Sequence, residues 1–556
     1  MFKQPAIEFT TMPLARPVRL PGWALMLLVL VYLLPGNLGH GPWRGDDLIN
    51  IAASAEMLRS GSWLMPHLAG TPVFDASPLH YWLGALFGGL LGWLLPLHDA
   101  IRLASVTALF GGLWALQQAA RELLPQDDKG HAALLLSLGT LGLVVHAHES
   151  QAQITLLASL CGMLWACARM ARQARSSGLM AGAFCAACFL AGGLAGLWLS
   201  VPMWLATLWS VRRRPRGDSR APLRSGDYLP GALLALLLIS AWPLLLYLRD
   251  PLLLDVWWHQ QWLNLNPQFN GKRLSTLFGL LSWFAWPLWP VAAWALWHRR
   301  AQLGQLGFVL PLTALLCALS LILSSAASRP ASILPVLPGL VLLAAGELSR
   351  LRRGASNWLN WFGIITFSLL GIFIWFAWSA LHLGWPVAMG RNVTRLAPGF
   401  LAQISVWSIC VATALSAMWL LAIWRVPRFA LRGALFWALG VTLTWGLLTT
   451  LWLDWFDYDR NYAPIMARIS RDAASQQSGC VLGLGTGATQ LAAFDYFTKL
   501  SVFSYSSKDE RCNLVLSYAS ARNKLRAPDG DWQLLWRVEK GRGRIQEQFA
   551  LYRRER

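Results

Sequence analysis

The stretch WRGDDLINIAASAEMLRSGSWLMPHLAGTPVFDASPLHYW, residues 43–82, decides the fold because it is a polar segment between two apolar ones. The apolar run 22–39 before it predicts an uncleaved first membrane helix. The run 79–96 after it is short and interrupted by glycines, which favours a juxtamembrane or re-entrant helix over a full span. We therefore expect residues 40–100 to form a long loop with juxtamembrane helices.

The composition of the whole chain indicates a polytopic membrane protein. Of 556 residues, 56% are hydrophobic and 13% are charged, and the mean hydropathy is +0.44. A soluble protein has about 25% charged residues. The 33 tryptophans agree, because indole rings suit the boundary between hydrocarbon and headgroups. We expect about thirteen spans, at 22–39, 101–120, 131–147, 154–172, 179–193, 195–211, 229–248, 275–298, 306–325, 332–348, 358–381, 401–424 and 430–453.

The net charge is +20, and the distribution of the basic residues along the chain agrees with the expected topology. Basic residues gather in alternate loops, as in cytoplasmic loops of membrane proteins. They are Arg121 and Lys129; Arg169, Arg172 and Arg175; Arg212, Arg213, Arg214, Arg216, Arg220 and Arg224; Arg299 and Arg300; Arg350, Arg352 and Arg353; Arg425, Arg428 and Arg432. This asymmetry predicts a multi-pass protein of the bacterial inner membrane with a cytoplasmic N-terminus and a periplasmic C-terminal segment. Nucleic-acid binding is not needed to explain the charge.

The C-terminal segment differs from the rest in composition. We expect a transmembrane domain at 1–454 and a small periplasmic α/β domain at 455–556, in which charged residues recur regularly. A helix is predicted at 460–474, and strands are predicted at 480–484, 500–505, 514–518, 532–538 and 546–552. Cys480 and Cys512 can pair there, because the periplasm is oxidising. The other six cysteines fall in apolar runs and are interpreted as small hydrophobic residues, including the pair Cys185 and Cys188.

Acidic residues near a membrane are costly to bury and mark the first place to look for function. Asp46 and Asp47 follow the first predicted span and precede a predicted helix from Asp47 to Leu58. Carboxylates at that position also cap the free N–H groups of a helix. The pair is therefore interpreted either as catalytic or as a simple cap.

The spacing in this stretch resembles that of the GT-C glycosyltransferases, in particular the glycosyltransferase family 39 type that includes the lipid A aminoarabinose transferase and the protein O-mannosyltransferases. The chain matches the family pattern in register at Asp46, Glu56, Met57, Ser60, Gly61, Trp63, Pro66, Gly70, Phe74, Pro78, Leu79, Tyr81 and Trp82. A weaker, collinear similarity is SRPASILPVLPGLVLLAAG at 328–346. The resemblance implies an all-α polytopic GT-C membrane protein of about thirteen spans, with a small C-terminal periplasmic α/β domain.

The resemblance also implies a reaction. A sugar would pass from a polyprenyl-phosphate donor to a lipid, glycan or protein acceptor on the periplasmic face, with membrane lipids around it. Asp46, with Asp47 and Glu149 as further candidates, would be the catalytic carboxylate that takes a proton or orients the acceptor. Substrate-binding candidates, the basic ones for the leaving phosphate, are Arg44, Tyr81, Lys272, Arg273 and Arg329.

The sequence departs from the family pattern at three positions. Ala76 stands where the family has the lysine thought to contact the donor phosphate, and Gly192 stands where a later lysine is common. Gln153 is aligned with an acidic position, for which Glu149 is a possible substitute. These departures keep open a second interpretation, a degenerate GT-C scaffold that binds lipid or an envelope partner. A transporter would show internal repeats, and none is recognisable in the sequence.

Cofactor chemistry is not expected. His146, His148 and Glu149 lie close together in sequence, but no further strong metal ligand is recognisable near them. We interpret the two histidines as polar residues at a helix end, with a divalent metal as the alternative. The segment 255–272 is interpreted either as an interfacial aromatic belt or as a loop that covers the site.

Overall fold

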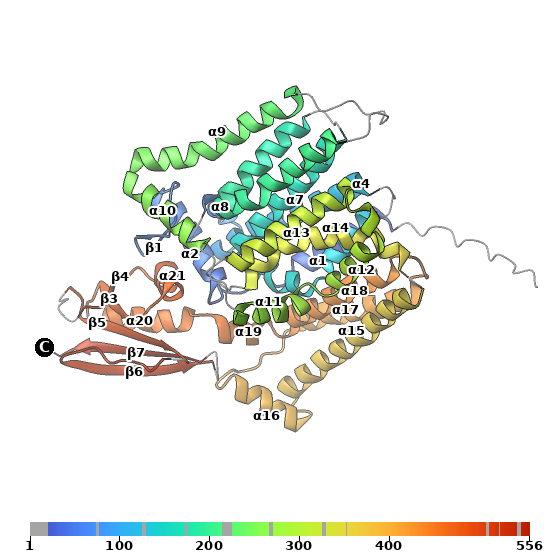
Figure 1. The fold of residues 1–556 in the computed structure, drawn as a ribbon. Coiled ribbons are helices and arrows are strands. Elements are labelled where there is room, and N and C mark those ends of the chain that lie inside the picture. The colour runs from blue at the N-terminus through green and yellow to red at the C-terminus, as the bar shows by residue number, and fades with distance from the viewer. Residues whose placement is uncertain are drawn as a thin grey trace, which may run out of the picture.

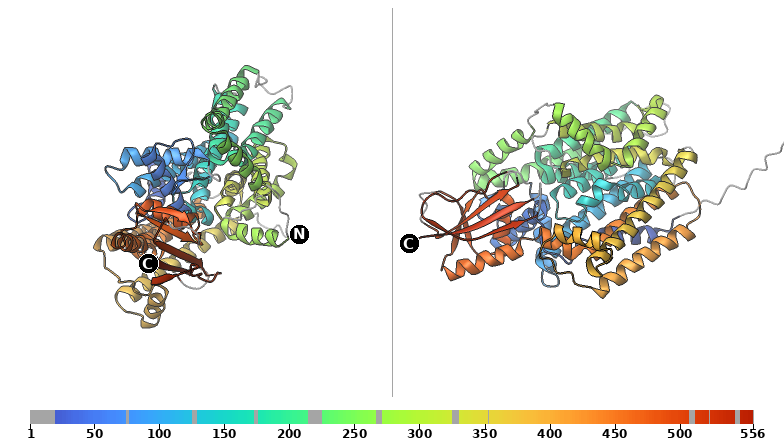
Figure 2. Two further views of the ribbon diagram at one scale, coloured as in Figure 1. Left: turned by 90° about the vertical axis from the view of Figure 1, so that its left-hand side faces the viewer. Right: turned by 90° about the horizontal axis from the view of Figure 1, so that it is seen from below.

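The structure is a computed structural model, and it describes residues 20–73, 77–124, 129–172, 176–213, 225–265, 271–324, 330–351, 353–506, 511–521, 523–541 and 546–555. A helical bundle fills most of it, and a small sheet lies at one end (Figure 1; Figure 2, right). We call this end the sheet end.

In the described part of the bundle and its loops there are nineteen α-helices, three short 3₁₀ helices and one two-stranded ribbon. The α-helices are α1 (Gly22–Leu33), α2 (Asp46–Ser60), α3 (Pro78–Leu91), α4 (Leu97–Leu123), α5 (Lys129–Leu138), α6 (Leu141–His146), α7 (Ala152–Ala171), α8 (Ser177–Arg212), α9 (Ser225–Arg249), α10 (Pro251–Asn264), α11 (Gly271–Phe284), α12 (Leu288–His298), α13 (Leu306–Ser324), α14 (Leu337–Glu347), α15 (Arg353–His382), α16 (Val387–Leu396), α17 (Val406–Arg425), α18 (Arg432–Leu451) and α19 (Leu453–Arg460). The 3₁₀ helices are η1 (Arg300–Gln302), η2 (Pro330–Val336) and η3 (Leu348–Arg350), and β1 (His67–Leu68) pairs with β2 (Thr71–Pro72).

Among the described residues, nine helical segments are long and apolar enough to cross a membrane. The predicted spans that fail this test individually are short or broken. The span predicted at 22–39 contains α1, which has only 12 residues. The span predicted at 131–147 is divided into α5 and α6 at Gly139, whose carbonyl accepts a 2.7 Å hydrogen bond from Trp437 Nε1 of α18. The span predicted at 275–298 bends by 94° between α11 and α12, where Pro287 cannot donate a backbone hydrogen bond.

Helix α8 contains two of the predicted spans in one continuous segment. Cys185 Sγ lies 3.5 Å from Ser200 Oγ, whereas a straight helix would separate these residues by about 22 Å. The chain therefore reverses direction at Gly193, which has φ 58° and ψ −137°. This backbone conformation suits only glycine. The predicted pair 179–193 and 195–211 is thus a tight helical hairpin.

The C-terminal region forms a mixed α/β sheet. It contains α20 (Ala463–Ser475), β3 (Cys480–Leu484), α21 (Ala488–Phe497), β4 (Ser501–Ser504), β5 (Leu514–Ser520), β6 (Trp532–Lys540) and β7 (Glu547–Arg554). The strand order is β4-β3-β5-β7-β6, with β3 parallel to β4 and β5 and the other pairs antiparallel. All five predicted strands and the predicted helix are confirmed within a few residues. Helix α21, which connects β3 to β4, was not predicted.

The predicted disulfide is present. Cys480 and Cys512 are bonded, with their Cα atoms 5.5 Å apart, within the range that a disulfide spans. The bond ties the start of β3 to the turn before β5. The six other cysteines are free.

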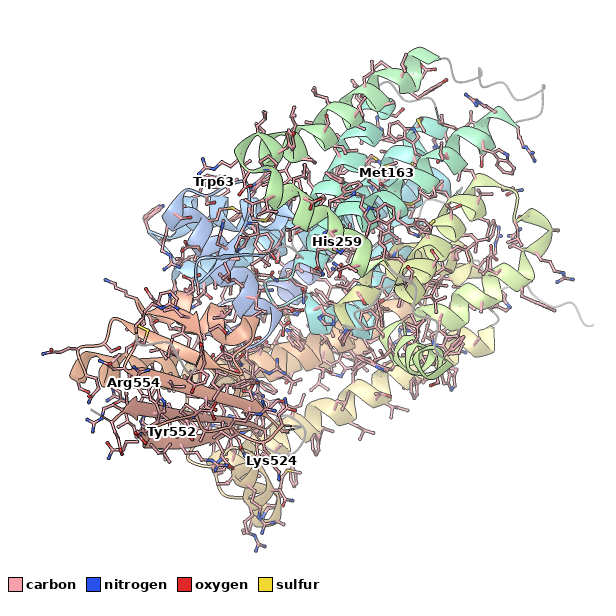
Figure 3. The ribbon with its side chains drawn as sticks, turned by 60° about the vertical axis from the view of Figure 1, so that its left-hand side comes forward. Trp63, Met163, His259, Lys524, Tyr552 and Arg554 are labelled. Carbon is pink, nitrogen blue, oxygen red and sulfur yellow. A yellow bond between two sulfur atoms is a disulfide. The ribbon has the colours of Figure 1, made fainter. Side chains whose placement is uncertain are left out.

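The first loop and the C-terminal region pack together. Leu48 and Met57 of α2 share one buried apolar cluster with Phe494 of α21 and Leu514 of β5. In Figure 3, Trp63 marks the loop after α2, Tyr552 and Arg554 mark β7, and Met163 lies among the bundle helices. Residues far apart in the sequence therefore meet at the sheet end. The predicted domain boundary at residue 454 stays a prediction.

Candidate active site

Helix α2 begins with the two aspartates. Gly45 precedes them with φ 103°, a conformation that favours glycine and lets the chain turn sharply into the helix. Asp47 is almost completely buried. Its Oδ1 accepts hydrogen bonds from the Ser150 backbone N–H at 2.6 Å and from Arg102 Nε at 3.1 Å. Its Oδ2 accepts from the Trp43 backbone N–H at 2.9 Å and from Arg102 Nη2 at 2.8 Å.

Asp47 therefore has a structural role in this geometry. Burial alone would raise the pKa of Asp47, but the Arg102 charge and its hydrogen bonds hold that pKa below its ordinary value. Arg102 of α4 is also fully buried and forms a 3.1 Å ion pair with Asp99. The cluster fixes the start of α2 against α4 and against the loop before α7. Both Asp47 oxygens are occupied, which favours Asp46 as the reacting carboxylate.

Asp46 is only partly buried and contacts different groups. Its Oδ2 accepts from Gln151 Nε2 at 3.4 Å. The sequence alignment placed Gln153 at the family's second acidic position, but the structure brings Gln151, the residue just before α7, to Asp46. His146 at the end of α6 interacts electrostatically with Asp46. Its ring is buried, and neither ring nitrogen has a hydrogen-bond partner among the described residues.

Glu149 lies in the same loop, between α6 and α7. Its side chain is 23% exposed and lies 3.7 Å from Arg460 Nη1. Burial raises the pKa of Glu149 to about 7, and the negative charges of Asp47 and Asp46 act in the same direction. Glu149 is therefore near half-protonated at neutral pH, a suitable state for a group that exchanges protons.

Arg460 was missed by sequence reasoning and belongs to this site. It is the last residue of α19, and its guanidinium lies over the rings of Trp43 at 5.0 Å and Phe456 at 5.8 Å. The backbone holds it there, because Arg44 N–H donates to the Arg460 carbonyl at 2.9 Å and Trp43 bridges to Asn461. The nearest sequence signal is that Arg460 begins the helix predicted at 460–474, after the last predicted span.

The other predicted binding residues are placed differently. Arg44 forms ion pairs with Asp459 at 3.2 Å and with Glu547 at 2.9 Å, so it joins the first loop to the C-terminal sheet. Tyr81 is buried and donates to Asn50 Oδ1 at 3.1 Å. The side chains of Lys272 and Arg273 on α11, and all of Arg329, lie outside the described residues.

His146 and His148 are not arranged as metal ligands with a third residue among those described. His148 is buried between two backbone carbonyls, Val144 O at 2.9 Å and Tyr32 O at 2.6 Å. In the part of the chain that the structure describes, no three His, Cys, Asp or Glu side chains are grouped as metal ligands. Both histidines are buried within the protein.

Comparison with known proteins finds similar sequences and similar structures. No family model matches the chain. Undecaprenyl phosphate-alpha-4-amino-4-deoxy-L-arabinose arabinosyl transferase 1 of Pseudomonas fluorescens strain Pf0-1 is 27% identical over 250 residues, 43% of this chain and 41% of the relative. Transferase 2 of strain Pf-5 is 30% identical over 253 residues, with the same coverage. The namesake from Serratia proteamaculans is 34% identical over 116 residues, 20% of each chain. The aligned part spans less than half of these relatives.

Solved structures match over nearly the full length. The crystal structure of ArnT from Cupriavidus metallidurans bound to undecaprenyl phosphate covers 95% of this chain and 98% of its own, with a TM-score of 0.63 at 17% identity. The apo structure of the same ArnT gives a TM-score of 0.62. The chain has the GT-C fold. The fold predicted from the first loop is thereby confirmed.

One departure from the GT-C pattern, Gly192, has a physical context. A Cβ on Gly192 would lie 3.0 Å from Leu156 Cδ2, so a lysine there would need Leu156 to move. A Cβ on Gly193 would lie 2.2 Å from Gln261 Oε1, so α10 packs closely on the turn of α8. Ala76 lies outside the described residues. A side chain at position 192 therefore needs Leu156 to shift by a few tenths of an ångström.

Proposed function

We propose that this chain is a membrane glycosyltransferase, which moves a sugar from an undecaprenyl-phosphate-linked donor to an acceptor at the sheet end of the bundle. The observation that carries the proposal is the partly exposed Asp46 beside Gln151, His146 and Glu149 in a GT-C fold. The names of the relatives, undecaprenyl-phosphate arabinosyl transferases, support the same donor class.

The proposed reaction is a nucleophilic substitution at the anomeric carbon. An acceptor hydroxyl attacks that carbon while its proton passes to Asp46, and the bond from the carbon to the phosphate oxygen breaks. The electron pair of that bond stays on the phosphate, which leaves as polyprenyl phosphate. If the acceptor nucleophile is an ionised phosphate, Asp46 orients it and takes no proton.

The loop charges support a periplasmic location for this reaction. The acceptor belongs to one of three classes, a lipid, a glycan or a protein of the envelope. The second candidate function is a catalytically degenerate GT-C scaffold that binds lipid or an envelope partner. The observation that favours it is the absence of the family lysines at Ala76 and Gly192.

Mass spectrometry of lipids and glycans separates the two functions. Cells that lack the chain are compared with the same cells carrying the wild-type chain or the Asp46→Asn variant. A glycosyltransferase adds one sugar increment to an envelope molecule in wild-type cells, and this increment is absent in the other two strains. An unchanged profile under conditions where the chain is expressed would support the binding scaffold.

A further inference from the structure

The charged side chains around Asp46 bear on which cation can bind a phosphate at the site. Asp46, Asp47 and Glu149 are three carboxyl groups in one small region, and Arg102 is already paired with Asp47 and Asp99. A polyprenyl phosphate that leaves during sugar transfer becomes more negative and needs a cation. Arg44 is paired with Asp459 and Glu547. Of the arginines described in this region, Arg460 is therefore the one to consider.

The contacts of Arg460 leave its donors available. Its ion pair with Glu149 is 3.7 Å long, whereas a charge-assisted hydrogen bond from arginine to an oxyanion is about 2.7–2.9 Å. Among the described residues, no side-chain hydrogen bond from this guanidinium is found, and its side chain is 42% exposed. Stacking on an aromatic face uses the flat side of a guanidinium and leaves its N–H edges free.

The rings under Arg460 are well fixed. Trp43 is 3% exposed, and its Nε1–H donates to Asp457 Oδ1 at 3.1 Å. The bridge from Trp43 to Asn461 places Arg460 beside the segment that enters α2, in which Trp43 lies three residues before Asp46. The fold therefore sets the backbone position of Arg460.

We propose that Arg460 binds the phosphate monoester of a membrane lipid in this site, and that Glu149 forms an ion pair with the Arg460 guanidinium when no phosphate is bound. This inference rests on the proposed function and adds the residue that serves in place of the family lysines missing at Ala76 and Gly192. The phosphate has two sources of the same chemistry, the polyprenyl phosphate of the donor and a phosphorylated glycolipid acceptor.

Equilibrium binding to the purified full-length protein in detergent tests the proposal, with undecaprenyl phosphate and monophosphoryl lipid A as separate probes and undecaprenol as the phosphate-free control. We expect Arg460→Gln to weaken binding of a phosphorylated probe by roughly 10- to 100-fold, because charged hydrogen bonds are lost. Glu149→Gln should tighten binding several-fold, because the competing carboxylate is removed. Undecaprenol binding should not change in either variant.

Arg468→Gln is the matched control. Arg468 lies over the Trp536 ring at 4.7 Å in the C-terminal sheet, so this variant removes a similar stacked arginine from a different place. Wild-type affinity of Arg460→Gln for both phosphorylated probes would overturn the proposal. If Arg460→Gln does not fold, the same binding measurements are made on Arg460→Lys and Glu149→Gln. Unchanged affinity of Glu149→Gln for the phosphorylated probes would show that Glu149 does not compete with the phosphate for Arg460. The probe that loses affinity identifies the lipid.

The binding assay contains no sugar acceptor, so its outcome is separate from the proposed function. A chain that binds undecaprenyl phosphate through Arg460 and transfers no sugar would be the binding scaffold. A chain that transfers sugar while Arg460→Gln binds normally would retain the function and refute the role of Arg460.

Discussion

At the scale of single residues, the two adjacent aspartates differ in what surrounds them. The N-cap residue of α2 is Gly45, and no side-chain capping hydrogen bond is present there. Asp46→Asn therefore keeps the size of the side chain but removes its charge and its ability to accept a proton. We expect its transfer rate in liposomes to fall by roughly 10² to 10⁴-fold with an unchanged melting temperature. Wild-type activity of this variant at matched expression would exclude a catalytic Asp46.

Asp47→Asn should instead lower stability, because among the described residues it leaves the buried Arg102 with Asp99 as its one carboxylate partner, beside the carbonyls of His40 and Gly41. Breaking a buried ion pair costs about 3–5 kcal/mol. The melting temperature of the two variants, measured in the same detergent, separates the two roles. Equal stability of both variants would contradict the structural role of Asp47.

His146 offers a second test at this scale. Removing a buried polar group that has no partner does not cost a hydrogen bond and relieves about 1–3 kcal/mol of desolvation. We therefore expect His146→Leu to be as stable as the wild type or more stable, while sugar transfer falls tenfold or more because the group beside Asp46 is gone. His148→Leu loses the hydrogen bond that the single ring N–H donates to a backbone carbonyl, Val144 O or Tyr32 O, and should lose stability. A fully active His146→Leu would show that this histidine only fills space.

Glu149 should give the protein a pH-dependent stability. Its pKa is raised from 4.5 to about 7 in the folded state, so the folded protein holds this proton more tightly than the unfolded chain. The resulting stabilisation is complete below pH 4.5 and is lost as the pH rises through 7. We expect the melting temperature of the wild type to fall relative to that of Glu149→Gln between pH 5 and 8. Parallel curves for the two proteins would show that Glu149 titrates normally.

The sequence predicts some of these residues and not others for a clear reason. Asp46 and Glu149 stand out because each is acidic beside an apolar run, which is a local pattern. Arg460 reaches the site only through the bridge between Trp43 and Asn461, and no local pattern indicates such a pairing. Gln151, and not Gln153, contacts Asp46, because Gln151 is the residue just before α7 begins at Ala152. The sequence alone leaves such a helix boundary uncertain by one or two residues.

At the scale of elements, the turn in α8 is sensitive to a single methyl group. Gly193→Ala adds a Cβ in a backbone conformation that costs other residues about 1–3 kcal/mol, and the Cβ would press on Gln261. We expect a clearly lower melting temperature for Gly193→Ala than for Gly226→Ala, where nothing lies near the added Cβ. Similar stability of the two variants would mean that the hairpin tolerates a different turn.

Apolar length predicted the elements well where a helix is straight and less well where another element intervenes. The long helices α4, α15 and α18 follow their hydrophobic runs. The interruption between α5 and α6 depends on Trp437, a residue of α18 that is distant in sequence. A sequence window contains the apolar run but not the side chain that packs against it.

At the scale of the whole molecule, the orientation in the membrane follows from the charged loops. A reporter fused after Arg556 should be active on the periplasmic side, and a reporter fused after Arg216 should be active on the cytoplasmic side, because the loop around Arg216 is strongly basic. Alkaline phosphatase and green fluorescent protein fusions measure the two sides. The opposite pattern would place the site on the cytoplasmic face.

The ion pair between Arg44 and Glu547 can form only late in synthesis. These partners are 503 residues apart in the chain, and at about 5–20 residues per second a ribosome needs roughly 25 to 100 s to travel that distance. Arg460 likewise follows every predicted span. A nascent chain that has already inserted its first helices thus holds Asp46 without the arginine beside it or the sheet that anchors the loop. The site cannot be complete before the C-terminal region has been synthesised, so an unfinished or truncated copy carries the aspartate in an incomplete site.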